Sequence, residues 1–339
     1  GGILAIGAGM SMGREGPSVH LGSLVGSGVK ELTKRSEVEE KYLVTCGASA
    51  GISSTFNAPL AGVIFSLEEL HKFFSPLLLI CTLVASGTSN YVSRMILGSQ
   101  TSFQYNFVLP EGIPYYIFAI ITVVFCVIIT VTGKAFSYFL LLTQKHYRNL
   151  KLNKYIKISI FMIMAYIVAV FFRDITGGGH ELIEEMFGKN VMLKTIIIIL
   201  LLKFFYTMFC YATGAPGGIF LPMLVVGALI GKVYGEILNN YFSVPNEIIV
   251  HFMLLGMAAY FTAVVRAPIT GITLILEMTG NFSYLYMLII VCTITYIFTE
   301  LLKMEPIYER LYFNMFHKEI LEEDKEKRRI QKRAKRLEI

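Results

Sequence analysis

The stretch 13-GREGP-17 decides the fold, because 218-GIFLP-222 repeats its pattern 205 residues later. Both stretches read G-x-x-x-P, and each leads into an apolar segment that contains glycine, 18–29 in the first case and 223–238 in the second. Proline is tolerated in the first turn of a helix, where the N–H that it lacks would have no helical partner anyway. Each stretch therefore predicts the beginning of a helix.

A second pair of matching stretches lies farther along the chain. Ala58–Gly62 (APLAG) precedes Glu68, and Ala267–Gly271 (APITG) precedes Glu277 at the same spacing, 209 residues later. Two pairs in the same order and at nearly the same offset indicate a duplicated unit. Duplicated halves of membrane transporters often have opposite orientations, with a substrate site where they meet near mid-membrane. The sequence shows the duplication, and the inversion is an expectation.

The composition favours a membrane protein. Hydrophobic residues make up 55% of the 339 residues, and the mean hydropathy is +0.61, whereas soluble domains are about 45–50% apolar. A helix needs about 20 apolar residues to cross a bilayer. Long segments with few charges occur at 76–93, 113–142, 191–215, 250–265 and 283–299. We expect an all-α, polytopic transmembrane domain over 1–316, with half-repeats 1–112 and 113–316.

The distribution of basic residues predicts the topology. Segment Gln144–Lys157 has five Lys or Arg and no acid, and 317–339 is also basic, whereas Gly98–Gly112 has no Lys or Arg. Basic loops remain in the cytoplasm, so 144–157 and the tail 317–339 are assigned there and 98–112 outside. Glu68 and Glu69 then lie near the cytoplasmic face. No aromatic residue interleaves with the basic tail, which argues against a nucleic-acid partner. Because the chain starts at Gly1 without Met and within an apolar segment, it is expected to lack its N-terminal helices.

Two helix N-termini that face one another can bind an anion. Unpaired N–H groups and the helix dipole favour negative charge there, and glycine lets the backbone approach an ion closely. The alternative is that Gly and Pro only pack helices together. Glu15 lies inside the first motif, so its carboxylate can compete with an anion for the N–H groups and release them on protonation. The alternative for Glu15 is a charge at a helix N-terminus.

These motifs resemble those of the CLC chloride channel and transporter family. The resemblance is carried by GREGP, GIFLP, the run 57-NAPLAG-62 that leads to Glu68-Glu69, and Pro306-Ile307-Tyr308, and it extends from Gly1 to about Tyr312. It implies an inverted repeat of tilted and broken helices, and a homodimer with one pore per subunit. It also implies a multi-pass protein of the lipid bilayer, and the composition suggests a bacterial plasma membrane.

The resemblance also implies roles for individual residues. Glu15 resembles the gating glutamate, Tyr308 the tyrosine whose hydroxyl contacts chloride, and Glu69 the inner acid that antiporters have and many channels lack. The remaining matches are the expected chloride-binding backbone positions Gly16, Ile219 and Phe220, and the supporting motif residues Gly13, Arg14, Pro17, Glu68, Gly218 and Pro222.

The function expected from this resemblance is exchange of chloride for protons, and the alternative is a passive, voltage- or pH-gated chloride channel. A third class, an intramembrane enzyme or a scaffold, is disfavoured because the sequence has no nucleophile or metal constellation, and no cofactor is expected beside the transported chloride. Gly177–Glu181 (GGGHE) begins like a zinc-protease motif, but Glu184 stands where the second His is required. The serine motif that helps to set anion selectivity in the family would precede Gly1.

Overall fold

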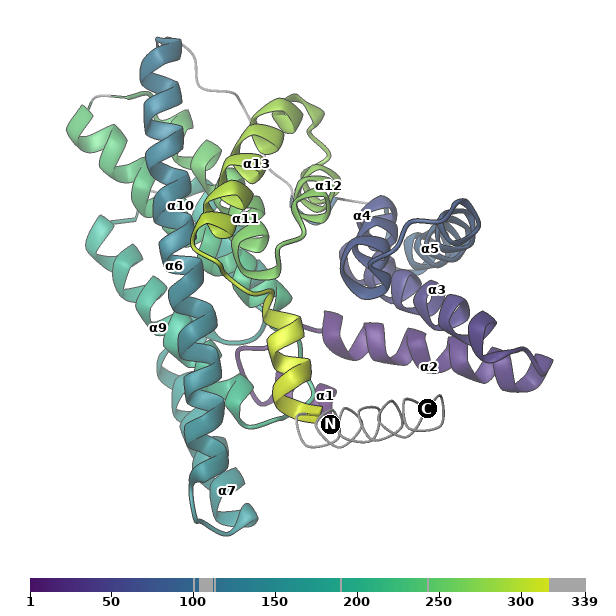
Figure 1. Ribbon diagram of the computed structural model, residues 1–339. Coiled ribbons are helices and arrows are strands. Elements are labelled where there is room, and N and C mark those ends of the chain that lie inside the picture. Colours follow the sequence, from purple (N-terminus) through teal and green to yellow (C-terminus); the bar gives the residue numbers. More distant parts are fainter. Residues whose placement is uncertain (100, 104–111, 113, 190, 243, 317–339) are drawn as a thin grey trace, which may run out of the picture.

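The computed structural model describes residues 1–99, 101–103, 112, 114–189, 191–242 and 244–316, and the regular structure in these ranges is helical (Figure 1). The predicted tail 317–339 lies outside the described residues. In chain order the elements are α1 Gly2–Gly7, α2 Glu15–Thr33, α3 Glu37–Phe56, α4 Pro59–Phe65, the π-helical turn η1 Ser66–His71, α5 Pro76–Leu97, α6 Tyr115–Asn149, α7 Lys154–Phe171, η2 Arg173–Ile175, α8 His180–Gly188, α9 Leu193–Ala212, α10 Phe220–Phe242, α11 Glu247–Val265, α12 Pro268–Thr279, η3 Phe282–Tyr284 and α13 Leu285–Leu301, followed by a helix over 307–316.

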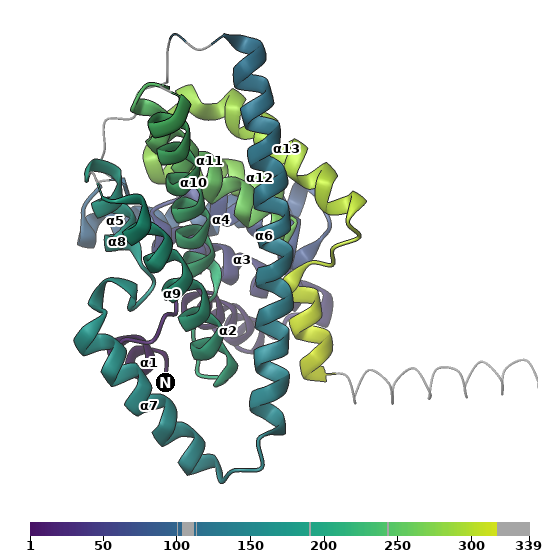
Figure 2. The same ribbon diagram turned by 90° about the vertical axis from the view of Figure 1, so that its left-hand side faces the viewer.

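Among the described residues, six helices are long and apolar enough to cross a membrane: α5, α6, α9, α10, α11 and α13. Helix α11 is buried along its whole length, and α6 packs against α9, α11 and α13 (Figure 2). A helix that is apolar all round is either a core helix or a membrane span. The expected all-α, multi-pass architecture is confirmed.

The duplicated unit is visible as two sets of helices, α2–α3–α4 and α10–α11–α12. Helices α2 and α3 cross at Gly22 and Gly47, and α10 and α11 cross at the equivalent Gly227 and Gly256. A Cβ atom on any of these four glycines would collide with the backbone of the other helix. Small residues allow membrane helices to approach closely, so the same residue type builds the same crossing in both halves.

The two halves are joined by an exchange of equivalent hydrogen bonds. The Gly13 N–H donates to the Gly218 carbonyl at 2.8 Å, and the Gly218 N–H donates to the Gly13 carbonyl at 2.9 Å. In a two-fold contact, each partner offers the other the same surface. The first glycines of the two G-x-x-x-P motifs therefore lie at a pseudo-two-fold axis.

Two equivalent carboxylates strengthen this junction. The Glu68 carboxylate accepts N–H bonds of 3.2 and 2.8 Å from the first turn of α12, and also the Thr270 hydroxyl at 2.8 Å. The Glu277 carboxylate accepts N–H bonds of 3.0 and 2.7 Å from the first turn of α4. Each half thus supplies a negative charge to a helix N-terminus of the other half, where the dipole favours it.

The equivalent helices α5 and α13 run in opposite directions. Lys72, just before α5, forms an ion pair with Glu309, which follows α13. At the other end, the N–H of Phe103, which follows α5, donates to the carbonyl of Met278, just before α13, at 2.9 Å. The start of one helix therefore lies near the end of the other. Since both helices are membrane spans, the duplication is inverted, as expected.

The motif helices begin earlier than the sequence predicts. Helix α2 starts at Glu15 rather than at residue 18, and α10 starts at Phe220 rather than at 223. Pro17 and Pro222 are therefore the third residues of their helices, still within the first turn. The helix boundary consequently falls on the residues that were expected to form the site.

Replacing either junction carboxylate by its amide should destabilise the fold. We expect Glu277→Gln to lower the free energy of unfolding by ~1–3 kcal/mol, the usual contribution of hydrogen bonds to a charged group. Glu68→Gln should cost more, because Glu68 also binds the Thr270 hydroxyl. Thermal unfolding of the detergent-solubilised protein, followed with a thiol-reactive dye, measures this. A wild-type midpoint in both variants would contradict the assignment.

Candidate functional site

Glu15 places a carboxylate of one repeat at the helix N-terminus of the other. Its Oε1 atom accepts the N–H of Leu221, in the first turn of α10, at 3.1 Å, and the backbone of Phe220 also acts on the carboxylate. Glu15 is 3% exposed, and its Oε2 atom has no hydrogen-bond partner among the described residues. A buried carboxylate oxygen without a hydrogen-bond partner is costly. In this position the hydrogen bonds therefore stabilise only one of the two carboxylate oxygens.

The glycines of the motifs make room for this carboxylate. A Cβ atom on Gly13 or on Gly218 would overlap the carboxylate of Glu15. A Cβ atom on Gly16 would lie 3.0 Å from the Gly218 nitrogen. Gly16, expected as an anion-binding position, therefore lies where the backbones of the two repeats approach each other.

The Glu15 carboxylate accepts from an amide that the sequence analysis did not name. The resemblance implied Ile219 and Phe220 as chloride-binding positions, and the N–H of the next residue, Leu221, donates to the carboxylate. Ile219 and Phe220 are buried beside it. Leu221 was missed because a backbone donor leaves no signal in the type of side chain, and because the start of α10 was placed too late.

Aromatic rings connect this helix N-terminus to Tyr308. The Phe220 ring lies 5.7 Å from that of Phe65, which in turn lies 6.3 Å from that of Tyr308, and Phe261 closes the other side of Phe220 at 4.6 Å. Tyr308 lies within electrostatic range of both Glu15 and Glu69. The structure thus links the buried residues Glu15 and Phe220 to the partly buried Tyr308.

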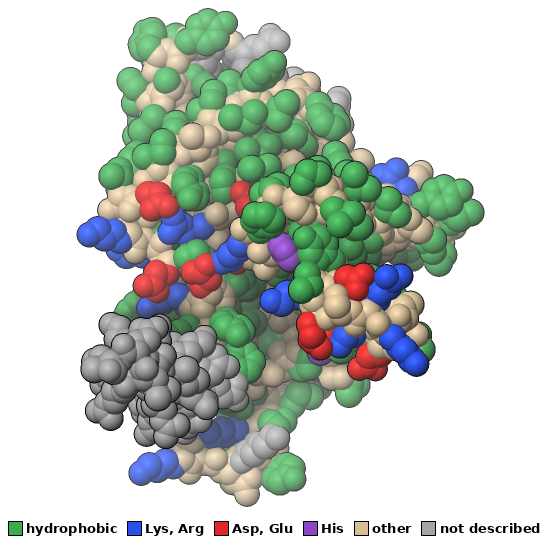
Figure 3. Space-filling model, turned by 45° about the vertical axis from the view of Figure 1, so that its right-hand side comes forward, with side chains coloured by type: hydrophobic (Ala, Val, Ile, Leu, Met, Phe, Trp, Pro, Cys, Tyr) green, Lys and Arg blue, Asp and Glu red, His purple; other side chains and the backbone are tan. Residues whose placement is uncertain are grey.

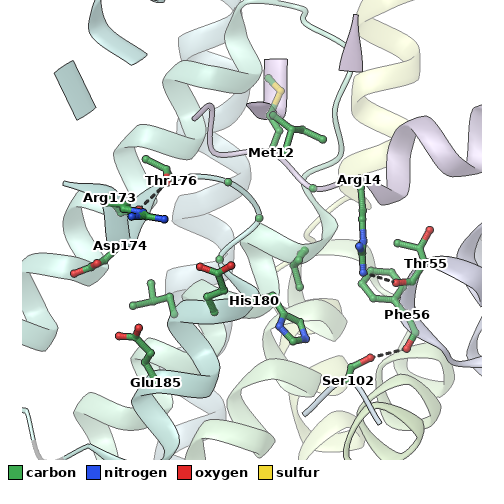
Figure 4. A pocket seen from close by; sticks show the side chains of 18 residues that line it. Met12, Arg14, Thr55, Phe56, Ser102, Arg173, Asp174, Thr176, His180 and Glu185 are labelled. Atoms are coloured by element: carbon green, nitrogen blue, oxygen red, sulfur yellow. Dashed lines mark hydrogen bonds between the residues drawn. The ribbon is translucent and has the colours of Figure 1, made fainter. Parts of the chain in front are cut away.

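A cavity of about 790 Å³ opens on one side of Glu15. Gly13, Arg14 and Leu221, which are neighbours or partners of Glu15, line it, and so does Ser102 of the segment assigned to the outside. Figure 4 shows Arg14 on one side, where it donates to the Thr55 carbonyl at 3.1 Å, and Arg173 and Asp174 on the other. By the predicted topology this is the outer cavity.

Two buried lysines bind main-chain carbonyls, and one of them holds the loop that lines the outer cavity. Lys203 on α9 donates to the carbonyls of Ile175 at 3.0 Å and Gly177 at 2.8 Å. Lys232 on α10 donates to the carbonyl of Lys189, just after α8, at 2.9 Å. Ionisable groups inside a membrane protein are costly and seldom incidental. The sequence analysis did not select either lysine, because their carbonyl partners are set only by the fold.

A second cavity, of about 910 Å³, contains Glu69 and Tyr308. Glu69 is 7% exposed and belongs to η1, where the chain leaves α4 through a π-helical turn. Such turns often occur at functional sites. The nearby helix 307–316 is joined to segment 144–157 by a bond from Arg148 to the Asn314 carbonyl, at 3.1 Å. Because that segment is assigned to the cytoplasm, this is the inner cavity.

His180 makes contacts of a different kind from those of a metal ligand. Its ring stacks on Phe103 at 4.9 Å, and its Nδ1 atom lies 3.8 Å from the Glu184 carboxylate. Within the described ranges, no group of three His, Cys, Asp or Glu side chains is placed to hold a metal ion. The arrangement therefore offers amide, hydroxyl and carboxylate groups, which suit a small anion and a proton.

Comparisons with known proteins agree with this architecture. The family model described as "Voltage gated chloride channel" matches residues 1–300. The "H(+)/Cl(-) exchange transporter ClcA" of Vibrio cholerae serotype O1 is 34% identical over 92% of this chain and 67% of its own length. The crystal structure of "a slow cyanobacterial Cl-/H+ antiporter" matches with a TM-score of 0.84 and 28% identity, over 92% of this chain and 74% of the other.

A eukaryotic CLC transporter structure shares the fold at 20% identity, with a TM-score of 0.71, over 89% of this chain and 53% of the other. The inverted repeat, the paired motifs and the family match all lead to one assignment. The chain belongs to the voltage-gated chloride channel, or CLC, family.

Proposed function

We propose that this protein exchanges chloride for protons across a membrane. The observation that carries the proposal is the Glu15 carboxylate, which occupies the N-terminal turn of α10 by accepting the Leu221 N–H at 3.1 Å. A helix N-terminus binds anions through its free N–H groups and its dipole. The Glu15 carboxylate therefore occupies the position that chloride takes when the carboxylate moves away.

The competition between the carboxylate and chloride couples the two ions. While Glu15 is ionised, it holds the amides at α10 and chloride is excluded. When Glu15 takes up a proton, it loses its charge and the attraction to the helix end. Chloride then binds in its place, among the amides and the Tyr308 hydroxyl. The displaced side chain moves towards the outer cavity and releases its proton to the water there.

The inner cavity supplies the second half of the exchange. Glu69 lines the same inner cavity as Tyr308 and is nearly buried, so it can take protons from the inner water and pass them towards Glu15. A passive channel has no need of a second buried acid on the inner side. This acid, together with relatives named as exchangers, favours exchange over the channel alternative.

The assembly we propose is a homodimer in a bacterial plasma membrane. Leu60 on α4 and Ile269 on α12 occupy equivalent positions of the two repeats, and both are about half exposed. Hydrophobic side chains also cover much of the surface in Figure 3, while most charged side chains lie across the middle of the view. An apolar surface of this kind suits lipid tails and a second copy.

Reconstituted wild-type protein tests the function directly. In liposomes with a chloride gradient and no pH gradient, we expect chloride movement to drive protons uphill in the opposite direction. A chloride electrode and a pH electrode recorded together measure both fluxes. Chloride movement that drives no protons would establish the channel alternative, and the absence of both fluxes would refute transport of chloride.

A further inference from the structure

Beside Glu69 lies an ion pair that joins the two repeats at the inner surface. Lys72 follows η1, and its Nζ atom pairs with the carboxylate of Glu309, which is next to Tyr308 in the chain. The side chains of Lys72 and Glu309 are 43% and 55% exposed. An exposed ion pair contributes little stability, about 0–1 kcal/mol, so stabilisation is a weak reason for its place.

The position of this pair is more informative than its strength. Glu69, Lys72 and Glu309 together line both the inner cavity of about 910 Å³ and a neighbouring cavity of about 400 Å³. Glu69 is almost inaccessible, whereas Glu309 reaches the water. Because the three side chains line the same two cavities, they form a short series from solvent to the buried acid.

The other charged groups around these cavities have partners of their own. Glu68 is bound to the N-terminus of α12, Arg266 pairs with Glu300, and Glu305 pairs with Arg310 at 3.0 Å. Glu305 and Arg310 line the inner cavity but not the neighbouring one that Glu69, Lys72 and Glu309 share. Glu309 is therefore the carboxylate that combines access to water with proximity to Glu69.

We propose that Glu309 is the proton-collecting residue of the inner surface, held at the cavity mouth by Lys72. The Glu309 carboxylate takes a proton from inner water and passes it, directly or through a water molecule, to the Glu69 carboxylate. Glu309 is then ionised again, and Lys72 keeps its proton throughout. The ammonium fixes the position of the carboxylate at the cavity mouth. This inference rests on the proposed exchange function.

A pair of variants distinguishes collection of protons from a structural role. Glu309→Gln removes the titratable group, while Lys72→Met removes the same ion pair and keeps the carboxylate. We expect Glu309→Gln to slow proton flux about tenfold. A group that transfers a proton at the reacting centre typically contributes about 10²–10⁴-fold. The loss is smaller here because Glu69, although only 7% exposed, lines the inner cavity and still receives protons slowly from its water. Lys72→Met should keep most of its proton flux, because the Glu309 carboxylate remains.

Glu305→Gln is the matched control, since Glu305 lines the same cavity and also pairs with a cation. It should leave proton flux unchanged. Glu309→Asp should recover part of the flux that Glu309→Gln loses. Equal losses of proton flux in Glu309→Gln and Lys72→Met would show that the ion pair has only a structural role. A wild-type proton flux in Glu309→Gln would refute the proposal. Each of these comparisons requires a wild-type protein that exchanges chloride for protons. A wild type without coupled flux would instead refute the exchange function itself.

Discussion

Replacing Glu15 by Gln is expected to abolish proton movement while chloride continues to cross. The amide has the size of the carboxylate but no negative charge, so it cannot compete with chloride for the Leu221 N–H, and it cannot carry a proton. We expect proton flux to fall by about 100-fold or more, as when a positioned proton-transfer group is removed. Chloride flux should also lose its dependence on pH. Simultaneous chloride and pH recordings from liposomes measure both effects.

A crystallographic measurement gives an independent test of the same replacement. In crystals of Glu15→Gln soaked in bromide, we expect an anomalous peak within hydrogen-bond distance of the Phe220 and Leu221 nitrogens. Wild-type crystals at high pH should show less density there, because the carboxylate occupies the position. Uphill proton movement in Glu15→Gln would rule out Glu15 as the proton carrier. A vacant helix end in the bromide data would rule out the anion site.

Replacing Glu69 by Gln should stop proton movement with a smaller effect on chloride. Glu69 is 7% exposed and lines the inner cavity beside Tyr308, so its removal leaves the buried region without an acid that faces the cytoplasm. Proton flux is again expected to fall about 100-fold or more. Chloride still binds at α10, because Glu15 and the amides are unchanged. The ratio of chloride to proton flux should therefore rise.

The pH dependence separates the two variants. Glu69→Gln retains Glu15, which can still exchange protons with the outer solution, so its chloride flux should keep a dependence on outer pH. Glu15→Gln should show none. If Glu69→Gln drove protons as well as wild type does, protons would have to reach Glu15 by another path, and the assignment of the inner cavity would be wrong.

The sequence determined the architecture because its signals are periodic or local. Apolar length predicts membrane spans, and the repeated G-x-x-x-P and A-P-x-x-G stretches predict two helix N-termini per half at equivalent places. Glu15 lies inside one of these stretches, whereas the roles of Tyr308 and Glu69 were implied by the resemblance to the CLC family. The inversion was an expectation from what duplicated membrane transporters usually show, and the opposite directions of α5 and α13 confirm it.

Contacts between the halves could not be predicted in this way. The Gly13–Gly218 exchange of hydrogen bonds, the carboxylate of Glu277 on α4 and the Lys72–Glu309 pair each join residues that are more than 200 positions apart. No local pattern specifies which glutamate reaches which helix end. The partner of Glu15 is a main-chain N–H, which every residue except proline carries, so its identity depends on how the two helices are placed.

By itself, the sequence determined that two like halves would each present helix N-termini, and that an acid would stand at one of them. Only the tertiary structure decided that this acid reaches across the pseudo-two-fold axis to Leu221, and that glycines at the axis give it room. The physical reason is that helix formation and membrane insertion depend on neighbours along the chain. The position of a charge in a buried site depends instead on the packing of segments from both repeats.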